Sequence, residues 1–204
     1  MSRIVTLLAA LIALAAGFAV YNFWPEEKPE ALIYEPPRAL KSFKLNSTAD
    51  GAIENDALKG QWTLLFTGYT FCPDICPTTM SDLKGVLPSL QEEVSKPVKV
   101  WMISVDPQRD DIERLTQYVN YFGDDFVGVR AEHKELFPFV RDLGLMYSIP
   151  DEGEENYLVN HSAAIILVNP NGHRKAIFNA DHQRGEIPVV DMEQLAKDFA
   201  IIAD

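Results

Sequence analysis

The segment from residue 66 to residue 80 reads FTGYTFCPDICPTTM and contains Cys72 and Cys76, the only two cysteines of the 204-residue chain. Three residues separate the two thiols, and a proline follows each of them. The apolar run at residues 62–66 leads into this segment and predicts a buried strand. Residues 81–94 (SDLKGVLPSLQEEV) repeat apolar side chains at helical spacing. The two cysteines are therefore predicted on a turn that leads from a strand into a helix.

Strands and helices alternate along the rest of the chain. Apolar runs and amphipathic stretches predict a strand at 98–106, helices at 110–123 and 133–145, a hairpin at 163–178 around the turn NPNG, and a helix at 189–202. This order predicts a sheet with one parallel βαβ half and helices on both faces. We therefore expect an α/β domain with a thioredoxin-like fold over residues 40–204.

Residues 4–24 form a run of 21 residues without a charged side chain. As a helix this run has a length of about 31 Å, which matches the roughly 30 Å of a hydrocarbon core. It ends in aromatic residues, which favour the membrane–water interface, and no cysteine near its end offers a lipid anchor. A cleaved signal peptide has a shorter apolar region followed by small residues. The run therefore predicts a single transmembrane helix that is retained.

Charge on the two sides of this run predicts its orientation. Arg3 is the sole formal charge in residues 1–24, and because positive charge stays cytoplasmic, residues 1–3 are expected to be a short cytoplasmic tail. Residues 25–39 hold four of the 13 prolines and are predicted to form an extended linker. No Arg-rich presequence of the mitochondrial type precedes the run. We expect a single-pass protein of the bacterial inner membrane whose domain faces the periplasm.

The composition excludes one class of partner and makes a structural disulfide unnecessary. The formal net charge is −12 at pH 7, and nucleic-acid binding needs clustered Lys and Arg, which the chain lacks. The hydrophobic content of 47% suits one globular domain, which at this size folds without a disulfide. In an oxidising compartment, a cysteine pair can still cycle between dithiol and disulfide.

Three interpretations of the cysteine pair differ in how they fit the spacing. A disulfide closes a loop of about five residues and stabilises the fold by only about 2 kcal/mol, which disfavours a purely structural bridge. A thioredoxin-type redox pair has two intervening residues, whereas this chain has three. Residues four apart in a helix have Cβ atoms about 5–6 Å apart, wider than the roughly 3.5–4.5 Å of a relaxed disulfide. A metal ion accommodates the wider gap, and two soft thiolates favour copper, so the redox and metal interpretations both stay open.

The chain has four histidines that could add an imidazole ligand. His161 lies in YLVNHSAAIILV, immediately before an apolar strand, where it is either a metal ligand or a cap of that strand. The other three are expected in polar or solvated positions: His133 at a helix start, His173 in a hairpin turn and His182 in a loop.

Other residues with chemical potential have structural explanations. Asp106 ends the second predicted strand and is expected to cap the turn there, with a role in partner docking as the alternative. The acidic segment at 151–156 (DEGEEN) is expected to be a solvated loop, with a docking patch for a basic partner as the alternative. Met80 and Met102 stand at core spacing and are expected to pack inside the domain rather than bind metal.

Two motifs and the histidine together resemble the SCO/SenC family: GYTFCPDICPTTM at 68–80, SVDPQRDD at 104–111, and His161. The resemblance covers nearly the whole chain. It implies a membrane-anchored thioredoxin-fold protein that binds one copper ion per domain and serves assembly of the CuA centre of cytochrome c oxidase. It further implies that Cys72 and Cys76 are the thiolate ligands and His161 the imidazole ligand.

The family resemblance leaves two functions open. One is a metallochaperone that passes copper, Cu(I) or Cu(II), from a periplasmic donor to the CuA-bearing subunit of the oxidase. The other is an enzyme, a thiol–disulfide reductase with Cys72 and Cys76 as its redox-active pair, that keeps the CuA-site cysteines reduced. Only the metal site needs His161, so this residue discriminates between them. Asn160 replaces an aspartate that is usual in the family, which bears on the relative affinity for the two copper states.

A peroxidase-like redox function on the same fold is the weakest alternative. Such a site needs a threonine or serine at a set spacing before its cysteine and a proline further upstream. The segment LLFTGYTFC at 64–72 lacks that proline.

Overall fold

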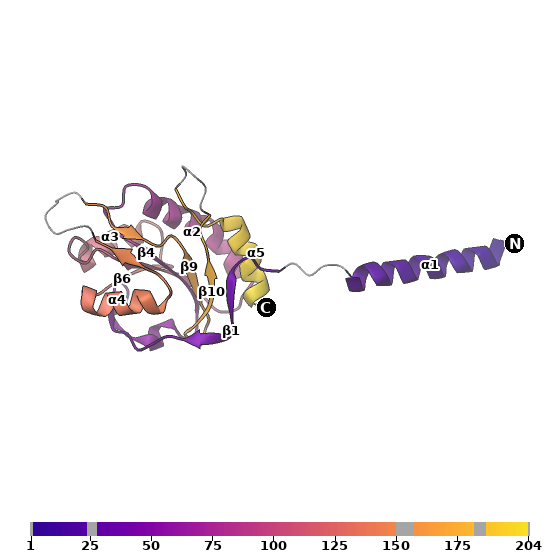
Figure 1. Ribbon diagram of the computed structural model, residues 1–204, viewed down its shortest axis with the longest axis horizontal. Coiled ribbons are helices and arrows are strands. Elements are labelled where there is room, and N and C mark those ends of the chain that lie inside the picture. Colours follow the sequence, from indigo (N-terminus) through magenta and orange to yellow (C-terminus); the bar gives the residue numbers. More distant parts are fainter. Residues whose placement is uncertain (1, 24–27, 150–156, 182–186, 204) are drawn as a thin grey trace.

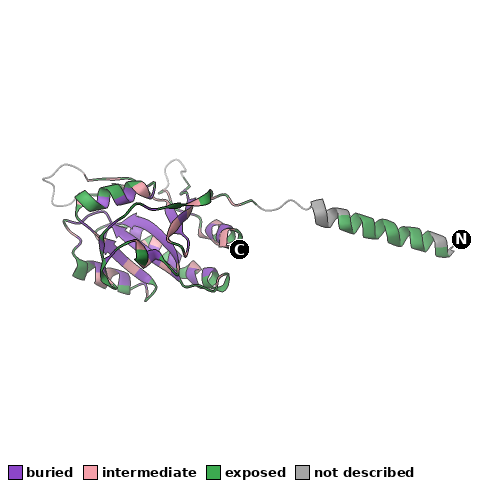
Figure 2. Cartoon of the chain, turned by 90° about the horizontal axis from the view of Figure 1, so that it is seen from below, coloured by how far each residue is buried: buried purple, intermediate pink, exposed green. Residues whose placement is uncertain are grey.

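A computed structural model of the protein describes residues 2–23, 28–149, 157–181 and 187–203. Helix α1 (Ser2–Phe23) occupies the N-terminal apolar run and is exposed along most of the length coloured in Figure 2. Among the side chains that the structure describes, which omit Ser2, Ile4 and residues 19–23, no helix combines the length and the apolar character needed to cross a membrane. The transmembrane anchor at residues 4–24 stays a prediction.

The described part of the domain is built on an eight-stranded sheet with the strand order β1-β10-β9-β4-β5-β6-β2-β3 (Figure 1). The strands are β1 (Leu32–Ala39), β2 (Leu45–Ser47), β3 (Gly51–Ile53), β4 (Trp62–Gly68), β5 (Val98–Ser104), β6 (Phe126–Arg130), β9 (Ile165–Val168) and β10 (His173–Phe178). Strands β4, β5 and β6 are parallel, and the β9–β10 hairpin joins β4 in the antiparallel sense. The predicted parallel half and the predicted hairpin are therefore confirmed.

Helices cover both faces of this sheet (Figure 1). Helices α2 (Ile75–Glu92), α3 (Ile112–Asn120) and α5 (Met192–Ala203) share a core with Leu64 and Phe66 of β4. Helix α4 (His133–Asp142) packs on the opposite face, in the core that includes Leu65. Because successive residues of a strand point to opposite faces, the fully buried β4 contributes to both cores. The short 3-10 helix η1 (Asn55–Leu58) precedes β4.

Helix α2 begins at Ile75, earlier than the predicted start at residue 81. Pro77 lies in the first turn of α2, as expected for a proline in a position where backbone N–H groups lack helical partners. The earlier start places Cys76 inside the helix and leaves Cys72 in the loop before it. The beginning of α2 therefore decides the geometry of the thiol pair.

The predicted linker at 25–39 is wrong for residues 32–39, which form β1 and pair antiparallel with β10. The pairing register shifts between Ile33 and Arg38, and this irregularity accommodates two consecutive prolines. The position of β1 at the edge of the sheet also tolerates the missing N–H groups. The folded domain therefore begins before the predicted boundary at residue 40.

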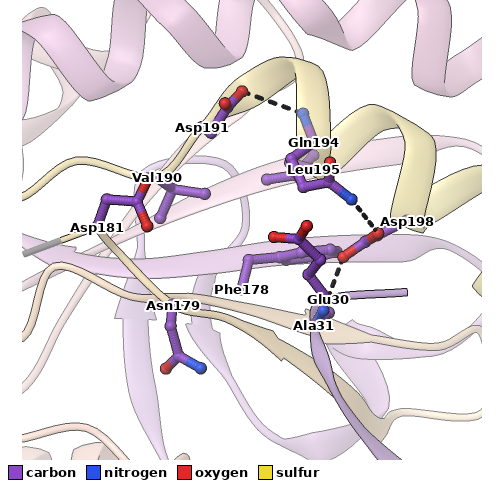
Figure 3. A pocket seen from close by; sticks show the side chains of 10 residues that line it. All are labelled: Glu30, Ala31, Phe178, Asn179, Asp181, Val190, Asp191, Gln194, Leu195 and Asp198. Carbon is purple, nitrogen blue, oxygen red and sulfur yellow. Dashed lines mark hydrogen bonds between the residues drawn. The ribbon is translucent and has the colours of Figure 1, made fainter. Parts of the chain in front are cut away.

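A buried carboxylate attaches the beginning of β1 to helix α5 (Figure 3). Asp198 is 2% exposed, and its two oxygens accept hydrogen bonds from the backbone N–H of Ala31 at 2.7 Å and from Nε2 of Gln194 at 2.8 Å. These groups line a cavity of about 350 Å³, together with the carboxylates of Glu30 and Asp191. Figure 3 shows the side chains around it. The N-terminal edge of the domain is thus bound to its C-terminal helix.

Candidate metal centre

The two thiols lie where the chain leaves the parallel strand β4 and enters α2. The backbone N–H of Cys76 donates to Sγ of Cys72 over 3.4 Å, which holds the two residues together across the start of the helix. Both cysteines are free thiols, and they are 8% and 1% exposed, respectively. The predicted position of the pair on a strand-to-helix turn is confirmed.

The pKa values of the two thiols are shifted in opposite directions. Hydrogen bonding with the Cys76 side chain lowers the pKa of Cys72 to about 4; burial opposes this effect, and hydrogen bonds from the backbone at Asp74 and Cys76 reinforce it. The pKa of Cys76 is raised, first because its thiol donates to Cys72 and second because it is buried. At neutral pH the pair is therefore a Cys72 thiolate beside a Cys76 thiol.

His161 faces the thiols from the short strand β8 (Asn160–His161), which pairs with β7 (Tyr147–Ser148). Its Nε2 lies 3.8 Å from Sγ of Cys76. Its Nδ1 lies 3.0 Å from the carbonyl oxygen of Ser162, which can only accept, so Nδ1 carries a proton. The hydroxyl of Thr67 donates to the same carbonyl at 2.9 Å. In the neutral imidazole this leaves the Nε2 lone pair directed at Cys76.

The distance between Sγ of Cys76 and Nε2 of His161 fits a shared metal ion. With bonds of about 2.3 Å to sulfur and 2.0 Å to nitrogen, as for zinc, two ligands of one ion lie about 3.5 Å apart in tetrahedral and about 4.3 Å apart in linear geometry. The observed 3.8 Å falls between these values. Over the described residues, no group of three or more His, Cys, Asp or Glu side chains stands ready to hold a metal ion. The fit therefore rests on the pairwise contacts of one imidazole and two thiols.

The segment after β5 fixes the loop that carries Cys72. Asp110 is fully buried, and its carboxylate accepts hydrogen bonds from the backbone N–H of Thr70 at 3.0 Å and from the Thr70 hydroxyl at 2.5 Å. The hydroxyl of Ser104 donates to the same carboxylate at 2.6 Å. Residues 69–74, between β4 and α2, form the cysteine loop. Because Thr70 lies two residues before Cys72, these bonds hold the cysteine loop against the end of β5.

The same segment also contacts the chain that leads to His161. The fully buried Asp106 accepts hydrogen bonds from Nε of Arg109 at 2.5 Å and from the hydroxyl of Tyr157 at 2.6 Å. Burial, followed by this bond to Asp106, raises the pKa of Tyr157 to about 12. Asp106 was predicted to cap a turn, and its carbonyl does accept from the N–H groups of residues 109 and 110. The prediction missed its side chain, which joins Arg109 to Tyr157.

The other histidines lie apart from the thiol pair or outside the described residues. His133 was expected on a solvated face, but it is half-buried because its Nδ1 lies 2.8 Å from the hydroxyl of Tyr147. His173 was expected in a turn, but it is the first residue of β10. His182 and the acidic segment at 151–156 lie outside the described residues.

Two methionines and one asparagine were also singled out in the sequence. Met80 and Met102 are fully buried in the core, as predicted. Asn160 is exposed in β8, next to His161. Its effect on the relative affinity for two copper states stays a prediction.

Residues 33–196 match the SCO1/SenC family. The chain belongs to this family. The human mitochondrial protein SCO2 homolog is 37% identical to it over 116 residues, which are 56% of this chain and 44% of that protein. A SCO2-like protein of Rickettsia prowazekii is 27% identical over 192 residues, which are 91% of this chain and 93% of that protein. The SCO1/SenC chain thus matches less than half of the length of the human SCO2 homolog.

Solved structures of ScoI proteins share the fold of this SCO1/SenC chain. Arabidopsis thaliana ScoI with copper bound has a TM-score of 0.70 at 26% identity and covers 80% of this chain and 97% of its own. Bradyrhizobium japonicum ScoI with copper bound has a TM-score of 0.64 at 27% identity and covers 80% of this chain and 99% of its own. The predicted thioredoxin-like α/β fold is therefore confirmed.

Proposed function

We propose that this SCO1/SenC protein is a metallochaperone that binds one copper ion through Cys72, Cys76 and His161 and serves assembly of the CuA site of cytochrome c oxidase. The observation that carries the proposal is the convergence of the only two thiols and Nε2 of His161 at one edge of the sheet. The two ScoI structures described above hold copper, which supports copper as the cargo. Two soft sulfurs and one imidazole nitrogen also suit both copper states.

The chain's own groups prepare the site for a cation. Cys72 offers an anionic sulfur at neutral pH without prior loss of a proton. Cys76 has to release its proton when its sulfur becomes a ligand, so loading releases about one proton per ion and weakens as the pH falls. The hydrogen bond from Nδ1 to Ser162 keeps the other ring nitrogen of His161 available as a ligand.

Copper titration of the chain and of three single variants tests the proposal. The wild-type chain should bind one ion, and its Cu(II) form should show thiolate-to-copper charge-transfer bands in the visible spectrum. Cys72→Ser or Cys76→Ser should abolish these bands because each removes one sulfur. His161→Ala should weaken Cu(II) binding by at least about 10–100-fold and Cu(I) binding less, since two sulfurs alone satisfy Cu(I).

His173→Ala is the matched control because it removes a half-buried histidine from β10. Its copper stoichiometry and bands should equal those of the wild-type chain. Wild-type stoichiometry and bands in either cysteine variant would refute the two-thiolate site.

The unequal protonation of the thiols favours a second candidate function, a thiol–disulfide reductase for the CuA-site cysteines. The Cys72 thiolate would attack a substrate disulfide and form a mixed disulfide; the Cys76 sulfur, once deprotonated, would then displace the substrate thiol and leave a Cys72–Cys76 disulfide. This reaction needs no imidazole ligand. Normal disulfide exchange and normal oxidase assembly with His161→Ala would favour the reductase, whereas failed assembly with intact thiols would favour copper delivery.

We also propose that residues 4–24 anchor the protein in the bacterial inner membrane, with the domain in the periplasm. The uncharged run of 21 residues and the position of Arg3 before it support this arrangement. Anchoring keeps the domain close to the CuA-bearing subunit, its proposed recipient, and exposes it to a periplasmic copper donor.

A further inference from the structure

Arg109 occupies the space between the two parts of the chain that carry the candidate ligands. Its guanidinium carbon lies 4.8 Å from the ring centroid of Phe71 and 5.8 Å from that of Tyr69, both in the cysteine loop. The same carbon lies 3.6 Å from the ring centroid of Tyr157, four residues before His161. Guanidinium groups stack favourably on aromatic faces. One side chain therefore contacts both the cysteine loop and residues 157–161, the histidine segment.

Hydrogen bonds fix the position of this side chain. Nε of Arg109 donates to Oδ2 of Asp106 at 2.5 Å, and a terminal nitrogen donates to the carbonyl of Tyr157 at 3.0 Å. The hydroxyl of Tyr157 donates to Oδ1 of Asp106 at 2.6 Å and closes the network. Asp106 is fully buried just after β5, and only 16% of the Arg109 side chain is exposed. The network is thus built on the rigid edge of the sheet.

The cysteine loop and the histidine segment also meet directly beside Arg109. The backbone at Val159 is hydrogen-bonded to the hydroxyl of Tyr69. The rings of Tyr69 and His161 meet edge to face, with their centroids 6.0 Å apart. A displacement of Arg109 would therefore disturb Tyr69 and Tyr157 together, and with them the approach of the imidazole to the thiols.

We propose that Arg109 is a positioning residue of the metal site, which sets the separation between the thiol pair and the His161 imidazole by holding the two segments together. The inference rests on the proposed copper function. Arginine suits this task because its planar fork reaches both Asp106 and Tyr157 while its flat face stacks on the rings. Lysine keeps the charge that compensates the buried Asp106, but its ammonium group has neither the forked set of N–H donors nor a flat surface that stacks on aromatic rings.

Lysine substitution in the full chain separates this geometric role from the charge. Arg109→Lys should weaken Cu(II) binding by about 10–100-fold and shift the visible bands, since losing a positioning contact costs about that much in metal affinity. Cu(I) binding, which the two sulfurs support, should change by less than about threefold.

Arg114→Lys is the matched control. The guanidinium carbon of Arg114 lies 3.9 Å from the ring centroid of Phe71, and its Nε donates to the Thr70 hydroxyl, so both contacts are with the cysteine loop. Its Cu(II) and Cu(I) affinities should stay within about threefold of wild type, as expected for an exposed cation.

A measurement on the metal-free protein keeps this inference distinct from the proposed function. Amide hydrogen exchange at Val159 and His161 should be at least about tenfold faster in Arg109→Lys than in wild type, because local opening becomes easier, and unchanged in Arg114→Lys. Tyr157→Phe keeps the ring but removes its bond to Asp106, so it should give an intermediate acceleration and serves if Arg109→Lys folds poorly.

The outcomes distinguish the positioning role of Arg109 from the proposed copper function. Wild-type exchange at these amides in Arg109→Lys and Tyr157→Phe would overturn the positioning role, and so would unchanged Cu(II) affinity and bands in Arg109→Lys. Faster exchange in a chain whose wild type binds no copper would instead support the positioning role and refute the proposed function.

Discussion

The thiols of Cys72 and Cys76 are close neighbours, yet their surroundings shift their pKa values in opposite directions. Cys72 is hydrogen-bonded by the Cys76 thiol and by backbone N–H groups at the start of α2, where the helix favours negative charge. Cys76 is almost fully buried and acts as a donor. One sulfur is therefore anionic and the other neutral before any metal binds, which limits the charge that the buried site has to carry.

Alkylation by iodoacetamide should report this asymmetry. The thiolate is the reacting species, and Cys72, with a pKa of about 4, is deprotonated throughout pH 6–8, so its rate should be nearly constant there. Cys76→Ala removes the largest cause of the lowered pKa, so the pKa of Cys72 should rise towards its ordinary value. The rate should then fall at pH 6 and rise by up to about tenfold per pH unit. Mass spectrometry of the modified peptide measures both rates.

Cys72→Ala provides the control for this experiment. Cys76 is then the sole thiol, and because it is 1% exposed and its burial still raises its pKa, it should react slowly across this range. A wild-type rate that rises tenfold per unit between pH 6 and pH 8 would contradict the asymmetry, because Cys72 would then titrate within that range.

Residue patterns in the sequence predicted the candidate ligands but not the residues that position them. Two thiols on a strand-to-helix turn and a histidine at a strand entrance are informative because such residues have few structural reasons to occur there. The contact between Arg109 and Tyr157 joins residues 48 positions apart, with α3, β6, α4 and β7 between them. No local periodicity encodes such a contact. The motif SVDPQRDD was noticed in the sequence, but the role of its arginine becomes visible only in the fold.

At the scale of elements, apolar runs predicted the buried strands, and the exceptions have physical causes. Strands β4 and β9 are buried on both faces and therefore read as continuous apolar runs. Strand β6 has only five residues and contains Gly128, which weakens its pattern. Strand β1 contains two consecutive prolines and resembles a linker, because what stabilises it lies far away in β10 and α5. Its partners, rather than its own composition, make it a strand.

Truncation tests whether β1 belongs to the folded domain. A fragment that starts at residue 28 keeps β1 and the bond from Ala31 to Asp198, whereas one that starts at residue 40 loses both. The shorter fragment exposes the edge of β10 and leaves one oxygen of the buried Asp198 without a donor. We expect it to unfold roughly 10 °C lower, which corresponds to a loss of about 3 kcal/mol or more, and to associate. Circular dichroism and size-exclusion chromatography measure these effects.

Glu35→Gln in the longer fragment is the matched control. It keeps the strand and removes only the ion pair between Glu35 and Lys175, in which Glu35 is mostly exposed. The free energy of unfolding should fall by no more than about 1 kcal/mol. Equal melting temperatures for the two fragments would show that β1 is dispensable and that the predicted boundary at residue 40 describes the stable domain.

At the scale of the whole molecule, charge and apolar surface are divided along the chain. All 30 acidic residues follow residue 24, together with 17 of the 18 basic residues. A domain with this excess of negative charge stays soluble and is not attracted to an anionic lipid surface. Association with a membrane therefore has to come from the apolar N-terminal run, where Leu11, Ile12 and Leu14 are 64–71% exposed. This distribution of charge and apolar surface supports the proposed anchor and argues against electrostatic adsorption of the domain to the membrane.

Reporter fusions after residue 204 test the proposed topology. An enzyme that is active only outside the cytoplasm should be active there, because the single positive side chain before the run, Arg3, favours a cytoplasmic N-terminus. Arg3→Glu should lower this activity, whereas Lys28→Gln, a charge change on the other side of the run, should not. Carbonate extraction should leave the full-length fusion in the membrane fraction. Activity of a cytoplasm-only reporter at residue 204 would reverse the orientation, and a soluble chain that begins near residue 25 would replace the anchor by a cleaved signal peptide.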